Sequence, residues 1–188
     1  MANVENSGMH EETLRAETVY RGKIVDVEHQ QVRLETGREA FREIVRHAPA
    51  VAVFVRHRDG RLVFIRQFRK PAERVVLELV AGILEPGEDP AAGARRELRE
   101  ETGYDAVRLE PLGPIFSSPG YADERIDLFL AEVDGAPAAL RLDPDERVQP
   151  AAMTEAEFRD LARRGGVVDG KTLAAWALVR CRAADGDG

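Results

Sequence analysis

Short runs in which apolar and polar residues alternate fill the first quarter of the chain. Such alternation is typical of strands that bury one face, and it recurs over residues 18–22, 23–34 and 40–47. Residues 36–39, Thr-Gly-Arg-Glu, separate the last two runs and are typical of a turn. The pattern therefore predicts an antiparallel β-meander at the N-terminal end.

A second pair of apolar runs follows at residues 50–57 and 61–68. Asp59 and Gly60 stand between them, and an Asp-Gly pair is a strong signal for a tight β-hairpin. These runs therefore predict two neighbouring strands. We expect His57, which lies beside the turn, to be exposed to solvent.

The rest of the chain mixes strands with helices. Asp89 can cap a helix that has Pro90 at its first position, and Gly103 is a favoured residue just after the end of that helix. Thr154 and Glu157 have the spacing of a capping box at the start of another helix. We expect further strands over residues 75–79, 106–116 and 125–133, a short segment near Val148, and a last helix over residues 171–182. This order does not form regular βαβ units, so the chain is predicted to be an α/β (α+β) protein with a mixed sheet between helical layers.

The composition fits a soluble globular domain with an extension. The chain has 188 residues, of which 27 are basic and 34 acidic, for a formal charge of −7. A negative protein is poorly suited to displace the counterions of nucleic acids, so we expect no nucleic-acid partner. The longest apolar stretches are shorter than the ~20 residues that span a bilayer. The polar first residues also lack the features of a signal peptide, and we expect no membrane association.

Cys181 is the single cysteine of the chain. It cannot form an internal disulfide, which favours a reducing cytoplasm as the location. It has no histidine at a suggestive spacing, so we do not expect a catalytic thiol. Trp176 is expected to pack in the core or in a dimer interface.

Three glutamates gather on one face of the helix predicted after Asp89. Glu97, Glu100 and Glu101 are spaced so that their carboxylates lie within an arc of about 100° on the helix surface. Like charges at this spacing destabilise a helix by about 0.2–0.5 kcal/mol per pair unless a counter-charge neutralises them. A hard divalent cation does so, because Mg²⁺ prefers oxygen ligands. A charged run of this kind is by itself more often a solvated helical face, and a metal site needs support from a wider pattern.

A wider pattern is present. Gly82 is followed by five residues and Glu88, then by seven residues and Arg96-Glu97, Leu98, one residue, Glu100-Glu101, one residue and Gly103. With each of seven fixed residue types at about one position in ten, a chance match has a frequency of about 10⁻⁷ per window. The segment resembles the Nudix box, Gly-x5-Glu-x7-Arg-Glu-U-x-Glu-Glu-x-Gly-U with U aliphatic, of hydrolases that cleave a nucleoside diphosphate linked to another group. Tyr104 departs from the pattern at the last aliphatic position, where the family residue packs rather than binds.

The resemblance implies a metal centre. Glu97 and Glu101 would bind divalent metal, and Glu100 would be a further ligand or a catalytic group beside it. The backbone carbonyl of Ala81 would add another ligand, and Arg96 would orient a carboxylate by a charge-assisted hydrogen bond. We expect Mg²⁺, or Mn²⁺ in its place, as two or three ions that bridge the diphosphate.

The resemblance also implies a general base or late metal ligand on a loop after the central sheet. Glu146 is the first candidate for this role and Asp145 the second. The alternative is that residues 142–149 form an exposed turn, which their Asp-Pro-Asp-Glu sequence also favours. Gln149 stands where related chains often have an acidic residue, so the identity of the base stays open.

Residues outside the box resemble the ADP-ribose pyrophosphatase branch of the Nudix family. Arg69 and Glu78 stand upstream of the box as in that branch, and residues 117–125 resemble its Ser-Pro-Gly-x-x-x-Glu segment. By this resemblance, Arg69 would bind a phosphate or the terminal ribose, whereas Glu78 and Glu124 would accept hydrogen bonds from adenine or ribose hydroxyls. Arg42 would reach the site of a partner subunit. The alternative for each is a surface ion pair.

The sequence thus predicts four parts: a flexible N-terminus at residues 1–13, a β extension for homodimerisation at 14–47, a Nudix hydrolase domain at 48–182 and a flexible tail at 183–188. The predicted function is metal-dependent hydrolysis of ADP-ribose, a small nucleoside diphosphate compound, to AMP and ribose 5-phosphate. One alternative is a Nudix hydrolase for a nucleotide sugar, NADH or FAD. Another is a non-catalytic ADP-ribose sensor, although sensors tend to lose the box carboxylates that this chain keeps.

Overall fold

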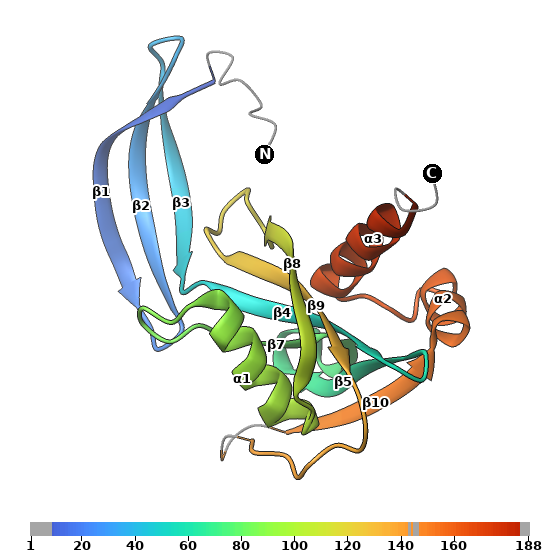
Figure 1. The fold of residues 1–188 in the computed structure, drawn as a ribbon. Helices are drawn as coiled ribbons and strands as arrows, with labels where there is room; N and C mark the ends of the chain where they lie inside the picture. The colour runs from blue at the N-terminus through green and yellow to red at the C-terminus, as the bar shows by residue number, and fades with distance from the viewer. Residues whose placement is uncertain (1–8, 143, 145–146, 185–188) are drawn as a thin grey trace. The chain divides into compact units, whose positions relative to one another are not determined.

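The computed structural model describes residues 9–142, 144 and 147–184, and the chain divides into two compact units (Figure 1). One unit contains the chain up to Ala48 together with Ser118–Glu124. The other contains Pro49–Ser117 and the chain from Arg125 onward. Among the described residues, no helix combines the length and the apolar character needed to cross a bilayer.

The first unit contains a three-stranded antiparallel sheet in the order β1-β2-β3. Its strands are β1 (Glu11–Arg21), β2 (Val25–Leu34) and β3 (Glu39–His47). The backbone N–H of Val45 in β3 donates to the carbonyl of Tyr121, which adds the segment 118–124 to this unit. The predicted meander is confirmed, and β1 begins ahead of residue 14, where the extension was expected to start.

The second unit is built on a seven-stranded sheet. Its strands are β4 (Ala50–His57), β5 (Arg61–Arg69), β6 (Arg74–Glu78), β7 (Val80–Ile83), β8 (Ala106–Phe116), β9 (Arg125–Val133) and β10 (Val148–Thr154). The main order is β10-β5-β4-β9-β8, with β6 beside β5 and β7 beside β4. Strands β4 and β9 are parallel and the other pairs are antiparallel, so the sheet is mixed, as predicted.

Helices cover both faces of this sheet (Figure 1). The helices are α1 (Pro90–Thr102), α2 (Glu155–Arg163) and α3 (Gly170–Ala184), and a short 3₁₀ helix, η1, spans Lys70–Ala72. Alternate residues of β4 point to opposite faces: Phe54 belongs to the cluster that contains Phe158 of α2, and Val53 to the cluster that contains Leu98 of α1. Full burial of such a side chain is worth about 1.5–3 kcal/mol. The predicted α/β/α sandwich is confirmed.

The helix ends follow the predicted signals. The carboxylate of Asp89 accepts hydrogen bonds from two backbone N–H groups in the first turn of α1. Gly103 ends α1 with a φ of 75°, a left-handed conformation that glycine adopts without strain. Thr154 and Glu157 form a reciprocal capping box at the start of α2.

The prediction that His57 is exposed was wrong. Its side chain is buried, with Nε2 3.0 Å from the carbonyl oxygen of Gly135 and Nδ1 2.9 Å from Oδ1 of Asp59. These contacts, first that with Gly135, raise the pKa of His57. The chain that follows β9 passes over the β4–β5 hairpin and covers the ring, and this tertiary contact cannot be seen in the local pattern.

Candidate functional site

The candidate box spans β7, the turn after it and α1. Leu98 is fully buried in the core beneath α1, which fixes the rotation of the helix about its axis. The three box glutamates lie to one side of Leu98. Glu97 and Glu101 are 8% and 1% exposed, and Glu100 is half-buried. The helix therefore places three carboxylates along one edge, two of them largely removed from solvent.

Gly82 in β7 lies directly against the carboxylate of Glu97. A Cβ on Gly82 would stand 1.9 Å from Oε1 and 2.0 Å from Cδ of Glu97. Carbon atoms in optimal contact are about 3.5–4.0 Å apart, so a side chain at this position would have to displace the glutamate. The glycine that opens the box is required by this close approach.

Arg96 joins three carboxylates of the box. Its Nε and Nη2 donate to the two oxygens of Glu88, both at 2.9 Å. Its Nη1 donates to Oε1 of Glu97 at 2.6 Å and to Oε2 of Glu100 at 3.2 Å. Nη2 also donates to the carbonyl of Ile83 at 3.3 Å, at the end of β7. One guanidinium thus links the loop, the strand and two of the helix carboxylates.

The charges in this cluster stabilise one another. The bidentate bond from Arg96, together with the backbone contact at Glu85, lowers the pKa of Glu88 to about 2. The same carboxylates, Glu88 first and Glu97 after it, raise the pKa of Arg96. Charge-assisted bonds of this kind are stronger than neutral ones. Glu88 therefore stays ionised at any pH near neutrality and secures the Arg96 side chain.

The last turn of α1 is tied to β7 through Glu101. The backbone N–H of Ala81 donates to Oε2 of Glu101 at 3.0 Å. Ala81 is also the residue whose carbonyl is predicted to bind metal, and it directly precedes Gly82. Strand β7 and helix α1 are therefore connected at two neighbouring points, one at Glu97 and one at Glu101.

The donor groups of the box suit a hard divalent cation. Carboxylate and carbonyl oxygens are the ligands that Mg²⁺ prefers, and Glu97, Glu100, Glu101 and Ala81 supply them. Within residues 9–142, 144 and 147–184, however, no three acidic, histidine or cysteine side chains stand together as a ready-made metal site. In the observed arrangement Glu97 and Glu100 direct oxygens to Arg96, so a cation would have to compete with the guanidinium for them.

Arg69 and Glu78 form a bidentate ion pair between the neighbouring strands β5 and β6. Nε of Arg69 donates to Oε1 of Glu78 at 2.7 Å, and Nη2 donates to Oε2 at 2.8 Å. Glu78 is 2% exposed, whereas the side chain of Arg69 is 42% exposed. The pKa of Arg69 is raised, first by Glu78 and less strongly by Glu101, so Arg69 lies in the electrostatic neighbourhood of the box.

Glu78 also contacts Lys171 at the start of α3, a residue that the sequence did not single out. Burial alone would raise the pKa of Glu78, but the bonds from Arg69 and Lys171 together outweigh burial and hold its pKa below the ordinary value. Nζ of Lys171 further donates to Oδ1 of Asp169 at 2.9 Å. Both oxygens of Glu78 therefore have protein partners, and its predicted bond to adenine or ribose stays a prediction.

Thr172 links the same end of α3 to Leu79, the residue that joins β6 to β7. Its Oγ1 accepts a hydrogen bond from the backbone N–H of Leu79 at 3.0 Å and donates to Oδ2 of Asp169 at 2.5 Å. The signal in the sequence is the Asp-Gly-Lys-Thr run at residues 169–172, which precedes an apolar helix. That run indicates a helix cap, but it does not reveal the tertiary partners.

The remaining predicted residues lie elsewhere or outside the described part. Arg42 and Glu124 belong to the first unit, where Arg42 forms a bidentate ion pair with Glu11 and Glu124 lies 3.7 Å from Nδ1 of His47. Glu146 and Asp145, the two candidates for the base, lie outside the described residues. All these roles stay predictions.

The segment before residue 143 is attached to the C-terminal end of α1. The backbone N–H of Ala138 donates to the carbonyl of Gly103 at 2.8 Å, and that of Arg141 donates to the carbonyl of Glu100 at 3.0 Å. These bonds satisfy carbonyl groups that a helix end leaves without intrahelical partners. The chain that leads toward the candidate base is thus held on the helix that carries the box carboxylates.

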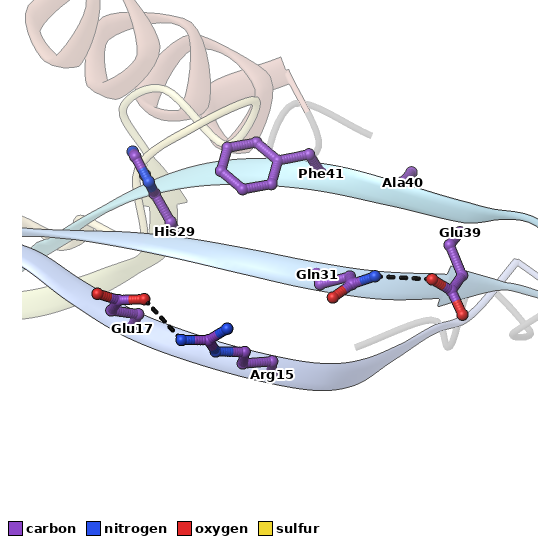
Figure 2. Close-up of a pocket in the computed structure, with 7 residues that line it drawn as sticks. All are labelled: Arg15, Glu17, His29, Gln31, Glu39, Ala40 and Phe41. Atoms are coloured by element: carbon purple, nitrogen blue, oxygen red, sulfur yellow. Dashed lines mark hydrogen bonds and ion pairs between the residues drawn. The ribbon is translucent and has the colours of Figure 1, made fainter.

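Surface pockets lie on the first unit, among them the following two, which described residues line. One, of about 400 Å³, is lined by Arg15, Glu17, His29, Gln31, Glu39, Ala40 and Phe41 (Figure 2). Its polar groups pair with one another: Arg15 with Glu17 at 3.0 Å and Gln31 with Glu39 at 2.7 Å. The other, of about 450 Å³, includes Arg42 in its lining. The first pocket contains none of the predicted site residues that the structure describes.

Comparison with known proteins shows similarity over nearly the whole chain. Residues 46–176 match the model of the NUDIX domain family. An ADP-ribose pyrophosphatase of Bacillus subtilis strain 168 is 39% identical over 177 residues, which are 94% of this chain and 96% of that protein. A methanol dehydrogenase activator of Bacillus methanolicus is 39% identical over 166 residues, 88% of this chain and 90% of that protein. The crystal structure of an ADP compounds hydrolase matches with a TM-score of 0.84 and 27% identity, over 97% of this chain and 98% of that one.

Proposed function

The chain belongs to the NUDIX family of hydrolases, and we propose that it cleaves ADP-ribose at the pyrophosphate bond in a metal-dependent reaction. The products are AMP and ribose 5-phosphate. We also propose the cytoplasm as its location, which the single cysteine, Cys181, favours because it allows no internal disulfide.

The observation that carries the proposal is the carboxylate cluster around Arg96. Glu88, Glu97 and Glu100 all accept hydrogen bonds from this one guanidinium. Gly82 at the same point leaves room for the Glu97 carboxylate. A solvated helical face, the alternative from the sequence, requires neither a glycine at this position nor buried glutamates. This packing therefore favours a functional site.

The box residues divide into metal ligands and supporting groups. Glu97, Glu101 and the carbonyl of Ala81 would hold Mg²⁺, or Mn²⁺ in its place, with Glu100 as a further ligand or as a catalytic group beside it. Two or three such ions, when bound, would neutralise the diphosphate and lower the pKa of the attacking water. Arg96 keeps the glutamate oxygens in place, and Glu88 in turn secures Arg96.

The reaction itself is an in-line displacement at phosphorus. A water molecule attacks one phosphorus of ADP-ribose, and the bond from that phosphorus to the bridging oxygen breaks. The bridging oxygen leaves with the other phosphate. Glu146 is the proposed acceptor of the proton that the water loses, with Asp145 as the second candidate.

Arg69 is the proposed contact to the substrate in the second unit. A guanidinium forms directed hydrogen bonds to phosphate and hydroxyl oxygens, which suits the phosphate or the terminal ribose of ADP-ribose. The pair with Glu78 fixes the orientation of the guanidinium, and the exposure of 42% leaves part of the side chain accessible. The influence of Glu101 on its pKa supports a place near the metal ligands.

We propose a homodimer formed through the first unit, with Arg42 reaching the site of the partner subunit; Glu124 is proposed to accept hydrogen bonds from adenine or ribose hydroxyls. Its sheet exposes the apolar side chains of Val19, Tyr20 and Phe41 by 46%, 57% and 58%, and a partner subunit could cover them. Sedimentation at micromolar concentration would test this. A monomer of 20.8 kDa would contradict the shared site.

A substrate panel tests the proposed activity. Two relatives with equal identity have different names, an ADP-ribose pyrophosphatase and a methanol dehydrogenase activator, so similarity alone does not select the substrate. We expect kcat/KM with Mg²⁺ to be highest for ADP-ribose among ADP-ribose, GDP-mannose, NADH and FAD. A higher value for another compound would reject ADP-ribose as the preferred substrate. Tight binding of ADP-ribose without metal-dependent product would favour a sensor.

A further inference from the structure

A chain of ion pairs runs from the start of α3 to Arg69. Asp169 contacts Lys171, Lys171 contacts Glu78, and Glu78 accepts both hydrogen bonds of Arg69. Glu78 and Lys171 are 2% and 12% exposed at their side chains. We infer that Lys171 is a positioning residue for Arg69 and acts through the buried carboxylate of Glu78. The inference rests on the proposed function only in that Arg69 is taken as a substrate contact.

The charges of this network are balanced. Asp169 and Glu78 carry two negative charges, and Lys171 and Arg69 carry two positive charges. Lys171 lies between the two carboxylates, since its Nζ contacts both. Without Lys171, Arg69 would be the cation shared by both carboxylates. Asp169 already contributes to the raised pKa of Arg69, so its negative charge acts on the guanidinium. Asp169 would keep its hydrogen bonds from Thr172 but lose its ion-pair partner, and the guanidinium would shift toward its negative charge.

The backbone beside Glu78 is fixed from the same end of α3. Strand β6 pairs with β5, whereas strand β7 pairs with β4. Leu79 is the residue that joins β6 to β7. The N–H of Leu79 donates to Oγ1 of Thr172. Two successive residues, Glu78 and Leu79, are therefore held by two successive residues of α3. The bond of Leu79 fixes the backbone next to Glu78, whereas the Glu78 carboxylate itself is held by Lys171 and Arg69.

The orientation of Arg69 follows from this support. Glu78 uses Nε and Nη2 of the guanidinium, so the Nη1 end is directed away from the buried carboxylate. The side chain is 42% exposed although its partner is buried. Glu78 and Lys171 thus present one end of a guanidinium to a ligand, and Lys171 keeps Arg69 from turning toward Asp169.

The test compares Lys171→Met, Asp169→Asn and the double variant Asp169→Asn/Lys171→Met. Asparagine still offers a side-chain oxygen to cap α3, and the double variant restores a neutral network. We expect Lys171→Met to raise the KM for ADP-ribose about tenfold with kcat within about twofold, because uniform binding is lost. We expect the double variant to recover most of this loss. A purely structural role for Lys171 predicts instead a lower free energy of unfolding with the KM of the folded protein unchanged, because contacts made with the substrate are not altered.

Two further measurements do not depend on catalysis. Calorimetry in EDTA gives the Kd of ADP-ribose without metal, and we expect it to rise and recover in parallel with KM. The Nε–H resonance of Arg69 in NMR spectra, assigned by its loss in Arg69→Lys, reports the guanidinium without any ligand. It should shift in Lys171→Met and return in the double variant. If ADP-ribose is not the substrate, this resonance still decides the inference.

Arg180→Met is the matched control, because it removes another cation of α3, whose partner is the partly exposed Glu155 at 3.0 Å. We expect Arg180→Met to leave KM, Kd and the Arg69 resonance unchanged. Lys171→Arg keeps the positive charge, and we expect its KM and Kd to stay close to the wild-type values. An unaltered resonance in Lys171→Met, or a double variant no better than Lys171→Met, would overturn the inference.

Discussion

The Glu97 carboxylate occupies the space that a side chain on Gly82 would fill. A Cβ at residue 82 would lie 1.9 Å from Oε1 of Glu97. Strand β7 pairs with β4 through the Gly82–Val51 register, so it cannot move away without losing its place in the sheet. Gly82 and Glu97 therefore fit against each other in space, although they stand at opposite ends of the strand–loop–helix segment that forms the box.

We predict that Gly82→Ala strongly lowers the activity of the protein and only moderately lowers its free energy of unfolding. The methyl group would displace Glu97 from Arg96 and from the predicted metal site. We expect kcat/KM to fall at least about 100-fold, and the free energy of unfolding to fall by about 1–3 kcal/mol, as for other overpacked sites. Steady-state kinetics and urea unfolding measure the two effects.

Gly170→Ala is the control for this substitution, because a Cβ at residue 170 meets nothing within 4 Å and its φ is not left-handed. We expect this variant to resemble wild type. If Gly82→Ala kept wild-type activity, the close approach to Glu97 would have no functional meaning.

The lowered pKa of Glu88 predicts a pH-dependent contribution to stability. Its pKa is about 2 in the folded protein, against an ordinary value of 4.5. The contribution is therefore fully present above about pH 5 and is lost as the pH falls toward 2, where the folded state also takes up the proton. Glu88→Gln removes this contribution. The difference in unfolding free energy between wild type and Glu88→Gln should shrink steadily between pH 5 and pH 3.

Glu85→Gln provides the comparison, since it changes an exposed carboxylate on the same loop. Any effect that comes from removing a charge from this loop, and not from the bond between Glu88 and Arg96, would appear in this variant too. If the difference in unfolding free energy between wild type and Glu88→Gln stayed constant over this pH range, Arg96 would not lower the pKa of Glu88.

Thr172→Val should destabilise the protein by removing the partner of a buried N–H group. Leu79 and Thr172 are both fully buried, so water cannot replace the lost hydroxyl. A buried donor left unsatisfied costs about 1–3 kcal/mol. Thr172→Ser keeps the hydroxyl and loses only a methyl group. Urea unfolding should rank wild type first, Thr172→Ser next and Thr172→Val last; equal stability of the two variants would argue against the Leu79 bond.

The sequence predicted those features that depend on neighbouring residues. The caps at Asp89 and Thr154 are local, and so is the spacing of the box glutamates on α1. Each follows from helix geometry within a few residues. The strands likewise follow from the local alternation of apolar and polar residues, so the mixed sheet and its helical layers could be predicted as well.

The features that the sequence did not reveal all depend on distant contacts. Lys171 meets Glu78 across 93 positions of the chain, and His57 is covered by Gly135 across 78. Neither contact leaves a periodic or spaced pattern. Glu146 lies outside the described residues, so the structure does not test its role, which rests on the resemblance to the family.

The rate of AMP release from ADP-ribose as a function of Mg²⁺ concentration, in wild type and in Glu101→Gln, tests the central claim most directly. Glutamine keeps the shape of the buried side chain and can still accept the bond from the N–H of Ala81, so the fold should persist. We expect saturable activation by Mg²⁺ in wild type and a rate at least about 100-fold lower in the variant. AMP release that is independent of Mg²⁺, or equal in both proteins, would contradict a metal-dependent reaction at this box.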